Sequence, residues 1–168
     1  MIIIRDDDIS VHTCPHSFKE VHQFFIDHKI IHTVACLMKD LWENQAVFHY
    51  LITAPYLNIE LHGLTHKNYS LMTYDEAFAE LRGAMDYYNI NAKRMLNTLV
   101  ELPELKRLTT FFSPWNKDSE TIRKVCADLG LRFNNTWDEF SFHCWSDEET
   151  KKVKENILNA IGTSRMVQ

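Results

Sequence analysis

The apolar residues follow two patterns along the chain. Some form short continuous runs, and others recur every three or four positions. The compact apolar runs are predicted to be strands, at residues 2–5, 30–38, 57–61, 108–112, 131–134 and 140–143. Apolar positions three and four apart predict helices at residues 17–28, 73–88, 91–101, 118–129 and 146–161. Residues 46–52 fit either element. Thr73 with Glu76 forms a capping box, which marks the start of the second helix.

Strands separated by helices predict an α/β fold with a mostly parallel sheet. The 168 residues, 45% apolar and 24% charged, suit one globular domain spanning 1–168. In such folds functional side chains gather where strands end. Here polar or aromatic residues directly follow five of the predicted strands. A functional site is therefore expected at that edge of the sheet.

Charge and cysteine content exclude several classes of protein. The net charge of −5 argues against a nucleic-acid partner. The four cysteines are widely spaced with no Cys-x-x-Cys pair, so reduced thiols are expected. The apolar start is too short for a signal peptide, and no run is long enough to span a membrane. We therefore expect a cytoplasmic protein with no membrane partner.

Three adjacent carboxylates, Asp6, Asp7 and Asp8, follow the first predicted strand. They repel one another unless a cation or water compensates their charge. One of them could bind a metal ion while its neighbour serves as a base. A solvated acidic turn or a helix cap is the alternative interpretation.

His62 and His66 follow the predicted strand at residues 57–61, with Gly63 allowing a sharp turn. Histidines four residues apart can chelate one ion. A chance pair is the alternative, since the chain has nine histidines and His28 with His32 shows the same spacing. Two imidazoles and one carboxylate leave positions open for water and substrate, which is typical of a catalytic metal site. We expect a divalent metal, with Zn²⁺ favoured.

Two later segments complete the predicted site. His143 could donate a proton to a leaving group, although a packed histidine is the alternative. Pro114, Trp115 and Asn116 form a turn after a strand, and the indole offers an apolar face for a sugar ring. A purely structural tryptophan is again the alternative. Tyr69 is a weaker aromatic candidate.

In order and spacing these motifs resemble the polysaccharide deacetylases, the NodB-like carbohydrate esterase family 4. The resemblance covers nearly the whole chain and rests on Asp7-Asp8, on His62 with His66, on the segment 113–116 and on His143. It implies a distorted, incomplete (β/α) barrel. It also implies a hydrolase whose metal-activated water removes the N-acetyl group of an amino sugar or polysaccharide.

Carried over residue by residue, the resemblance assigns Asp7 as general base and His143 as general acid. It assigns Asp8, His62 and His66 as metal ligands. It places Pro114 and Trp115 in the substrate subsite, where Asn116 and Tyr69 are further candidates. Registering the acids one residue earlier, as Asp6-Asp7, is the alternative.

The chain departs from the family pattern at three points. Ile9 replaces the usual glycine after the acidic pair, and Phe112 stands where the third motif carries an arginine that orients the base. Arg5 is a candidate to compensate. The chain is also short for a barrel, which typically takes about 250 residues.

Two functions from other classes remain open. A catalytically silent carbohydrate-binding relative is favoured by the missing arginine. A phosphoesterase or an iron(II) oxygenase could use the same Asp-His-His ligands.

Overall fold

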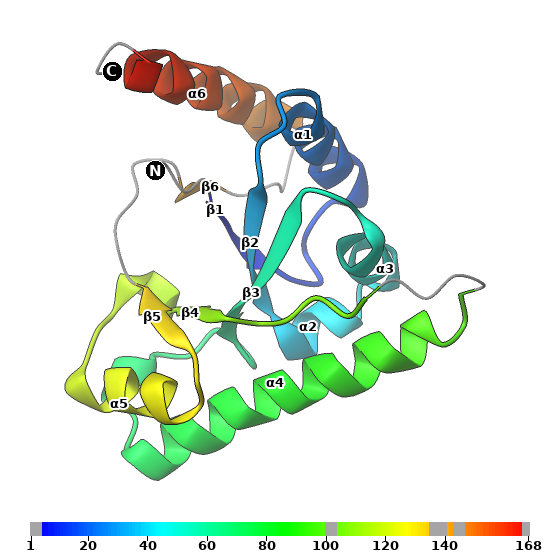
Figure 1. Cartoon of the computed structure of the whole chain (residues 1–168). Helices are drawn as coiled ribbons and strands as arrows, with labels where there is room; N and C mark the ends of the chain where they lie inside the picture. The colour runs from blue at the N-terminus through cyan, green and yellow to red at the C-terminus, as the bar shows by residue number, and fades with distance from the viewer. Residues whose placement is uncertain (1–4, 100–103, 135–140, 143–146, 166–168) are drawn as a thin grey trace.

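The computed structural model describes residues 5–99, 104–134, 141–142 and 147–165. Its centre is a single sheet of six strands (Figure 1). The strands are β1 (Arg5–Ile9), β2 (His32–Leu37), β3 (Leu57–Gly63), β4 (Thr110–Phe112), β5 (Arg132–Asn134) and β6 (Ser141–Phe142). Every pairing is parallel, and the order is β5-β4-β3-β2-β1-β6.

This strand order is that of an incomplete barrel. Strands consecutive in sequence lie side by side from β1 to β5, and β6 returns to the far side of β1. In the described residues no pairing joins β5 to β6, so the ring stays open at that point. A doubly wound sheet would instead reverse its order at β1. The expected distorted, incomplete (β/α) barrel is confirmed.

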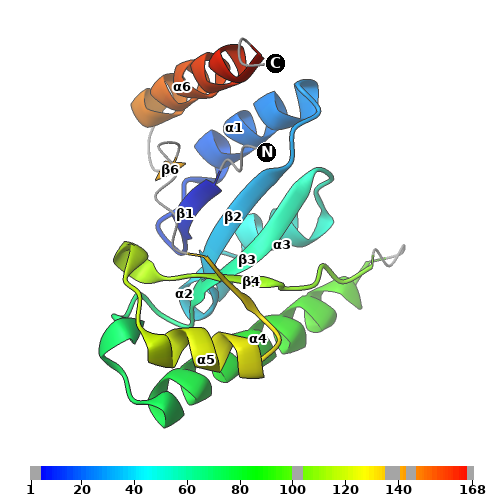
Figure 2. The ribbon, with the colours of Figure 1, turned by 60° about the vertical axis from the view of Figure 1, so that its left-hand side comes forward.

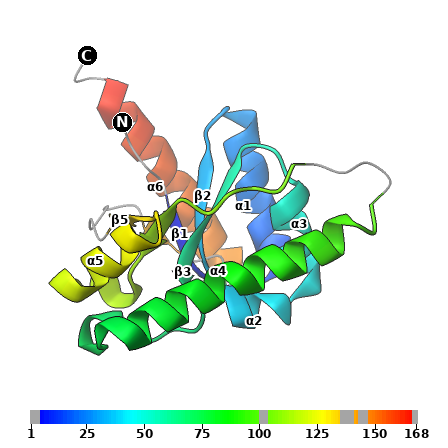
Figure 3. The same ribbon diagram turned by 60° about the horizontal axis from the view of Figure 1, so that its bottom comes forward.

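Helices lie outside the sheet. They are α1 (Pro15–Asp27), α2 (Met38–Trp42), α3 (Gln45–Thr53), α4 (Tyr74–Leu96), α5 (Glu120–Asp128) and α6 (Asp147–Arg165). Figure 2 shows α6 alongside α1, where Lys154 pairs with Glu20. Figure 3 shows the long α4 crossing below the strands. None of these described helices combines the length and apolar character that a bilayer crossing requires.

Alternation along the strands separates the packed outer face of the sheet from its inner face. In β3, Ile59 and Leu61 join the buried cluster that packs against the helices. Glu60 and His62, which follow these two residues in alternation, lie on the opposite, inner face, because successive side chains of a strand alternate. Polar groups on β3 therefore point into the open barrel.

Two predicted elements differ from the structure. The first strand was expected to end at Arg5, but β1 continues through the acids to Ile9 because the carboxylates of Asp6 and Asp7 find buried partners. The helices expected at 73–88 and 91–101 are one helix, α4. Its buried stripe continues through Asn91, and its Thr73–Glu76 capping box is confirmed.

The other elements follow the sequence pattern closely. The ambiguous segment 46–52 lies in α3, and α2 was not foreseen. Gly130, two residues after the end of α5, adopts a left-handed φ of 71°, as is typical of a glycine at a helix C-terminus. The last helix, expected to end at residue 161, continues to Arg165.

Candidate metal and catalytic site

Asp8, His62 and His66 meet at the edge of the sheet where β1 and β3 end. Their ligand atoms all lie within 4.8 Å of one another. Asp8 Oδ1 lies 3.1 Å from His62 Nε2 and 3.2 Å from His66 Nε2. Tetrahedral ligands at about 2.0–2.1 Å from a zinc ion would stand about 3.3 Å apart. The separation of the carboxylate from each imidazole thus matches a shared cation.

A bulge in β1 brings Asp8 to this position. The strand pairs Asp6 with Val34 and Ile9 with Cys36, so three steps along β1 match two along β2. Within the bulge Asp8 has a left-handed φ of 58°. Strict alternation would place Asp7 and Asp8 on opposite faces, whereas a bulge redirects a side chain. Both carboxylates are thereby available at one end of the barrel.

The hydrogen bonding of His62 fits a cation between the ligands. Its Nδ1 lies 2.9 Å from the carbonyl oxygen of Phe112, which can only accept, so Nδ1 carries the proton. In the neutral ring, Nε2 then carries a lone pair, and this lone pair faces those of the Asp8 carboxylate. A divalent metal resolves this opposition, and the Nδ1–H bond fixes the ring for ligation. The three residues fit the metal implied by the resemblance.

The turn after His62 depends on Gly63 and Tyr69. Gly63 has φ 125°, and a Cβ there would stand 2.4 Å from the Tyr69 hydroxyl. That hydroxyl accepts a 3.0 Å hydrogen bond from the Leu64 amide. Burial raises the pKa of Tyr69 far above its usual range, so the phenol stays neutral. The phenol thus supports the backbone that leads from His62 to His66.

Arg5 clamps Asp7 from the same strand. Its Nε lies 2.6 Å from Asp7 Oδ1, and its Nη2 donates to Asp7 Oδ2 at 2.7 Å. This is a two-point guanidinium–carboxylate pair, the strongest arrangement for holding a carboxylate. The guanidinium is 1% exposed and lies 4.5 Å over the ring of Phe112. Arg5 therefore contacts the predicted base beside the position where the family's arginine is missing.

The segment Pro114–Asn116 forms a short turn, η2, in which Trp115 departs from helical backbone angles. The indole of Trp115 is half exposed and meets the ring of His66 edge to face at 4.2 Å. The side chain of Asn116, expected near the sugar, accepts a hydrogen bond from Arg5. Pro114 is buried.

Asp6 lies on the other face of β1, away from His62 and His66. Its Oδ2 is 3.7 Å from Nε2 of His32, whose Nδ1 is 3.2 Å from Nδ1 of His22. His22 in turn donates from Nε2 to the Pro55 carbonyl oxygen. Burial lowers the pKa of both histidines. Of the three acids, Asp8 therefore lies with His62 and His66, which favours the register Asp7-Asp8 over Asp6-Asp7.

The remaining predicted site residues are placed as follows. Tyr69 is fully buried and has no exposed face for a sugar. His143 lies outside the described residues. The sequence named Phe112 and Asn116 but did not predict their contacts with Arg5, because each contact joins residues more than a hundred positions apart.

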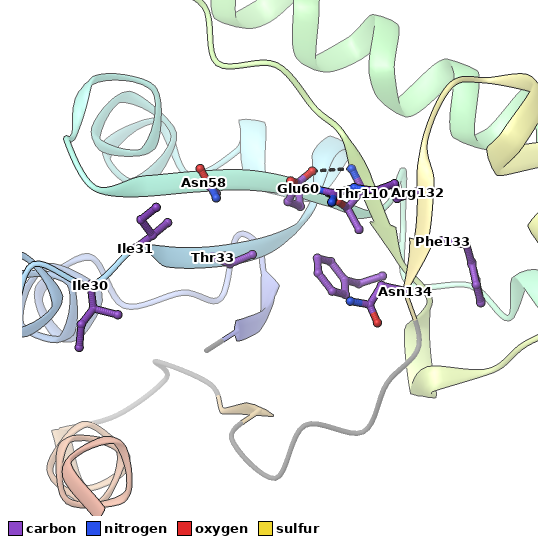
Figure 4. Close-up of a pocket in the computed structure, with 10 residues that line it drawn as sticks. Ile30, Ile31, Thr33, Asn58, Glu60, Thr110, Arg132, Phe133 and Asn134 are labelled. Carbon is purple, nitrogen blue, oxygen red and sulfur yellow. Dashed lines mark hydrogen bonds between the residues drawn. The ribbon is translucent and has the colours of Figure 1, made fainter. Parts of the chain in front are cut away.

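The open barrel also holds a cavity of about 440 Å³ that is lined by both polar and apolar side chains (Figure 4). Figure 4 shows Thr33, Asn58 and Glu60 on β2 and β3 facing Asn134 on β5 across it. Glu60 is buried and accepts hydrogen bonds from the amides of Thr109 and Thr110, which anchors the start of β4. The alternation of Asn58, Glu60 and His62 on β3 is the sequence signal that indicates this inner polar face.

The fold has close counterparts among solved structures. A family 4 carbohydrate esterase from Streptomyces lividans, in complex with acetate, matches with a TM-score of 0.69 at 13% identity, over 96% of this chain and 88% of that chain. Another family 4 carbohydrate esterase, from Bacillus anthracis, matches with a TM-score of 0.70 at 11% identity, over 96% and 76%. The chain has the fold of the family 4 deacetylases, as its motifs predicted.

A family 4 pseudoenzyme from Bacillus anthracis also matches, with a TM-score of 0.58 at 15% identity, over 77% of this chain. This chain spans 42% of the length of that protein. No protein-family model and no curated protein matches the sequence. At these identities the shared property is the fold.

Proposed function

We propose that this chain is a metal-dependent hydrolase that removes N-acetyl groups from an amino sugar or polysaccharide. The observation that carries the proposal is the approach of Asp8, His62 and His66 at the end of the barrel, on a fold shared with carbohydrate esterases. Three protein ligands leave coordination positions for water and substrate, as in catalytic rather than structural sites. The ligand set favours zinc among divalent metals.

A divalent cation held there would supply Lewis-acid chemistry, acidifying water and polarising an amide carbonyl. The protein's own residues divide the remaining work. Asp7, adjacent to the ligand Asp8, takes the proton of the attacking water, and the Arg5 clamp keeps its carboxylate in one orientation. His143 returns a proton to the leaving amine. The half-exposed Trp115 provides an apolar face for the sugar ring.

The contact between Arg5 and Asp7 favours catalysis over silent binding. A chain that had lost turnover has no chemical need for a buried arginine paired with the acid beside its metal site. Burying an ion pair costs desolvation free energy, which good geometry and further hydrogen bonds only offset. Here the pair is retained with two-point geometry at 1% exposure of Arg5.

A second candidate function is a carbohydrate-binding relative without turnover. Phe112 in place of the third-motif arginine favours it, and a pseudoenzyme shares the fold. The two functions differ in one measurement, which is acetate release from the N-acetylglucosamine tetramer by the zinc-loaded protein. Binding of the tetramer without acetate would support the silent relative.

The test of the proposal combines metal content with turnover. We expect about one zinc ion per chain in the parent, and its loss in Asp8→Ala and His66→Ala, because each removes one of three ligands. Asp7→Asn should keep the metal and lose acetate release, since an amide cannot accept the proton. His49→Ala is the control, because His49 is an exposed histidine on α3.

Two results would contradict this assignment. Retention of zinc by Asp8→Ala would show that the three residues do not form the metal site. Persistence of turnover in Asp7→Asn would remove Asp7 as the base while leaving the metal site intact.

A further inference from the structure

The turn formed by Trp115 and Asn116 has an unusual backbone. Both residues are in the left-handed region, with φ of 53° and 52°. Non-glycine residues rarely adopt this conformation, and two in succession are rarer still, because the Cβ crowds the backbone. Such strain persists only where the surrounding structure fixes it, and it is found mainly at functional sites.

The two side chains of this turn reach the two halves of the site. Trp115 packs its ring against His66, a ligand partner of Asp8. Asn116 accepts a 3.2 Å hydrogen bond from Nη2 of Arg5, the same nitrogen that donates to Asp7. The left-handed conformation therefore lets two adjacent side chains reach different residues, Trp115 contacting His66 and Asn116 contacting Arg5.

We propose that Asn116 is a positioning residue, which holds Arg5 so that Arg5 holds the Asp7 carboxylate. This inference rests on the proposed function, since it concerns how the base is oriented. It differs from the sequence expectation that Asn116 contacts the sugar.

The surroundings of Arg5 show why a second anchor matters. The guanidinium is planar and grips a carboxylate at two points only when its own plane is fixed. The ring of Phe112 covers one face at 4.5 Å, but an aromatic ring offers no hydrogen-bond acceptor that fixes the orientation of the group within its plane. The amide oxygen of Asn116 supplies such an acceptor at Nη2, on the edge of the guanidinium.

The substitution Asn116→Gly separates the hydrogen bond from the backbone. Glycine keeps the left-handed conformation without strain and removes only the amide. With acetate release from the N-acetylglucosamine tetramer as the assay, we expect kcat to fall about tenfold, the lower end for a hydrogen bond to a charged group. KM should stay within about twofold and zinc content should be unchanged, since no ligand is touched.

Lys29→Gly is the matched control. Lys29 also has a left-handed φ, 55°, and lies exposed in the turn after α1, away from the site. Its replacement relieves the same kind of strain and should leave kcat, KM and zinc content unaltered.

A double-mutant cycle distinguishes positioning from a general structural effect. In an Arg5→Met background Asn116→Gly should cause no further loss of kcat, because the group that Asn116 holds is gone. An equal loss in both backgrounds overturns the proposal, as does a rise in KM at constant kcat, which would mark a sugar contact. Turnover unaffected by Asn116→Gly overturns the positioning role alone, whereas absence of turnover in the parent overturns the proposed function and this role with it.

Discussion

The glycine between the two histidines offers a sharp test of how the site is built. Gly63 adopts φ 125°, a region in which side chains are strained. A Cβ at this position would stand 2.4 Å from the Tyr69 hydroxyl and 2.9 Å from the Thr65 carbonyl oxygen. Both atoms lie in the turn that leads to His66. Gly63→Ala therefore strains the backbone and displaces a buried phenol at once.

The size of the effect follows from these two contributions. Backbone strain in a disfavoured region costs about 1–2 kcal/mol. Forcing an extra methyl group into a packed site costs about 1–3 kcal/mol. Movement of Tyr69 also weakens its hydrogen bond with the Leu64 amide. We expect the free energy of unfolding to fall by about 2–5 kcal/mol, a large share of a typical domain's 5–15 kcal/mol.

Urea denaturation of the metal-free protein measures this loss, and competition with a chelator measures zinc affinity. Two other glycines serve as controls. A Cβ at Gly130 would meet nothing within 4 Å, so Gly130→Ala should cost only the strain of φ 71°, about 1–2 kcal/mol, with zinc affinity unchanged. Gly83→Ala, inside α4, should stabilise by up to about 1 kcal/mol. A cost below about 1 kcal/mol for Gly63→Ala, with unchanged zinc affinity, would refute the reasoning.

Two further predictions concern buried polar groups. Burial lowers the folded-state pKa of His22 and His32 below 6.5, so as the pH falls below about 6.5 the unfolded chain takes up protons that the folded protein does not. The free energy of unfolding should therefore decrease between pH 6.5 and 5.5, and a His22→Phe/His32→Phe variant should show a flatter profile; parallel profiles would count against this. Glu60→Ala should lower the free energy of unfolding by about 1–3 kcal/mol in urea denaturation, because the amides of Thr109 and Thr110 both donate to Oε2 of Glu60 and would lose this acceptor; an unchanged midpoint would contradict it.

The sequence singled out Asp8, His62 and His66 as candidate metal ligands because their signals are local. A glycine directly after the first of two histidines indicates a turn that returns the chain to the same point, and the structure places Gly63 in such a turn. The parallel sheet was also predicted, since helical segments between apolar runs are typical of parallel strands. Compact apolar runs and capping signals thus predicted most of the helices and strands.

Other features depend on tertiary contacts that local patterns do not encode. The bulge at Asp8 is a mismatch between β1 and β2, so it exists only in the pairing of two segments. The extension of β1 over acidic residues depends on Arg5 and His32 as buried partners. The continuity of α4 past residue 89 reflects buried Asn91, whose side chain donates to the Tyr87 carbonyl oxygen within the helix. Local propensity argues against each of these, and packing overrides it.

Phe112 stands where the family pattern has an arginine, while Arg5 on another strand supplies a guanidinium. A missing motif residue therefore does not by itself decide activity. The sequence has an aromatic ring where an arginine was expected on β4, and an arginine three residues before Asp8 on β1. In the fold these two side chains stack at 4.5 Å, so the guanidinium occupies the space beside β4 although it belongs to β1. From there it meets Asp7 at two points. The orientation of a carboxylate depends on where the neighbouring positive charge lies, whichever strand supplies that charge. The arrangement around Asp7 is therefore the feature that should decide between a deacetylase and a silent relative.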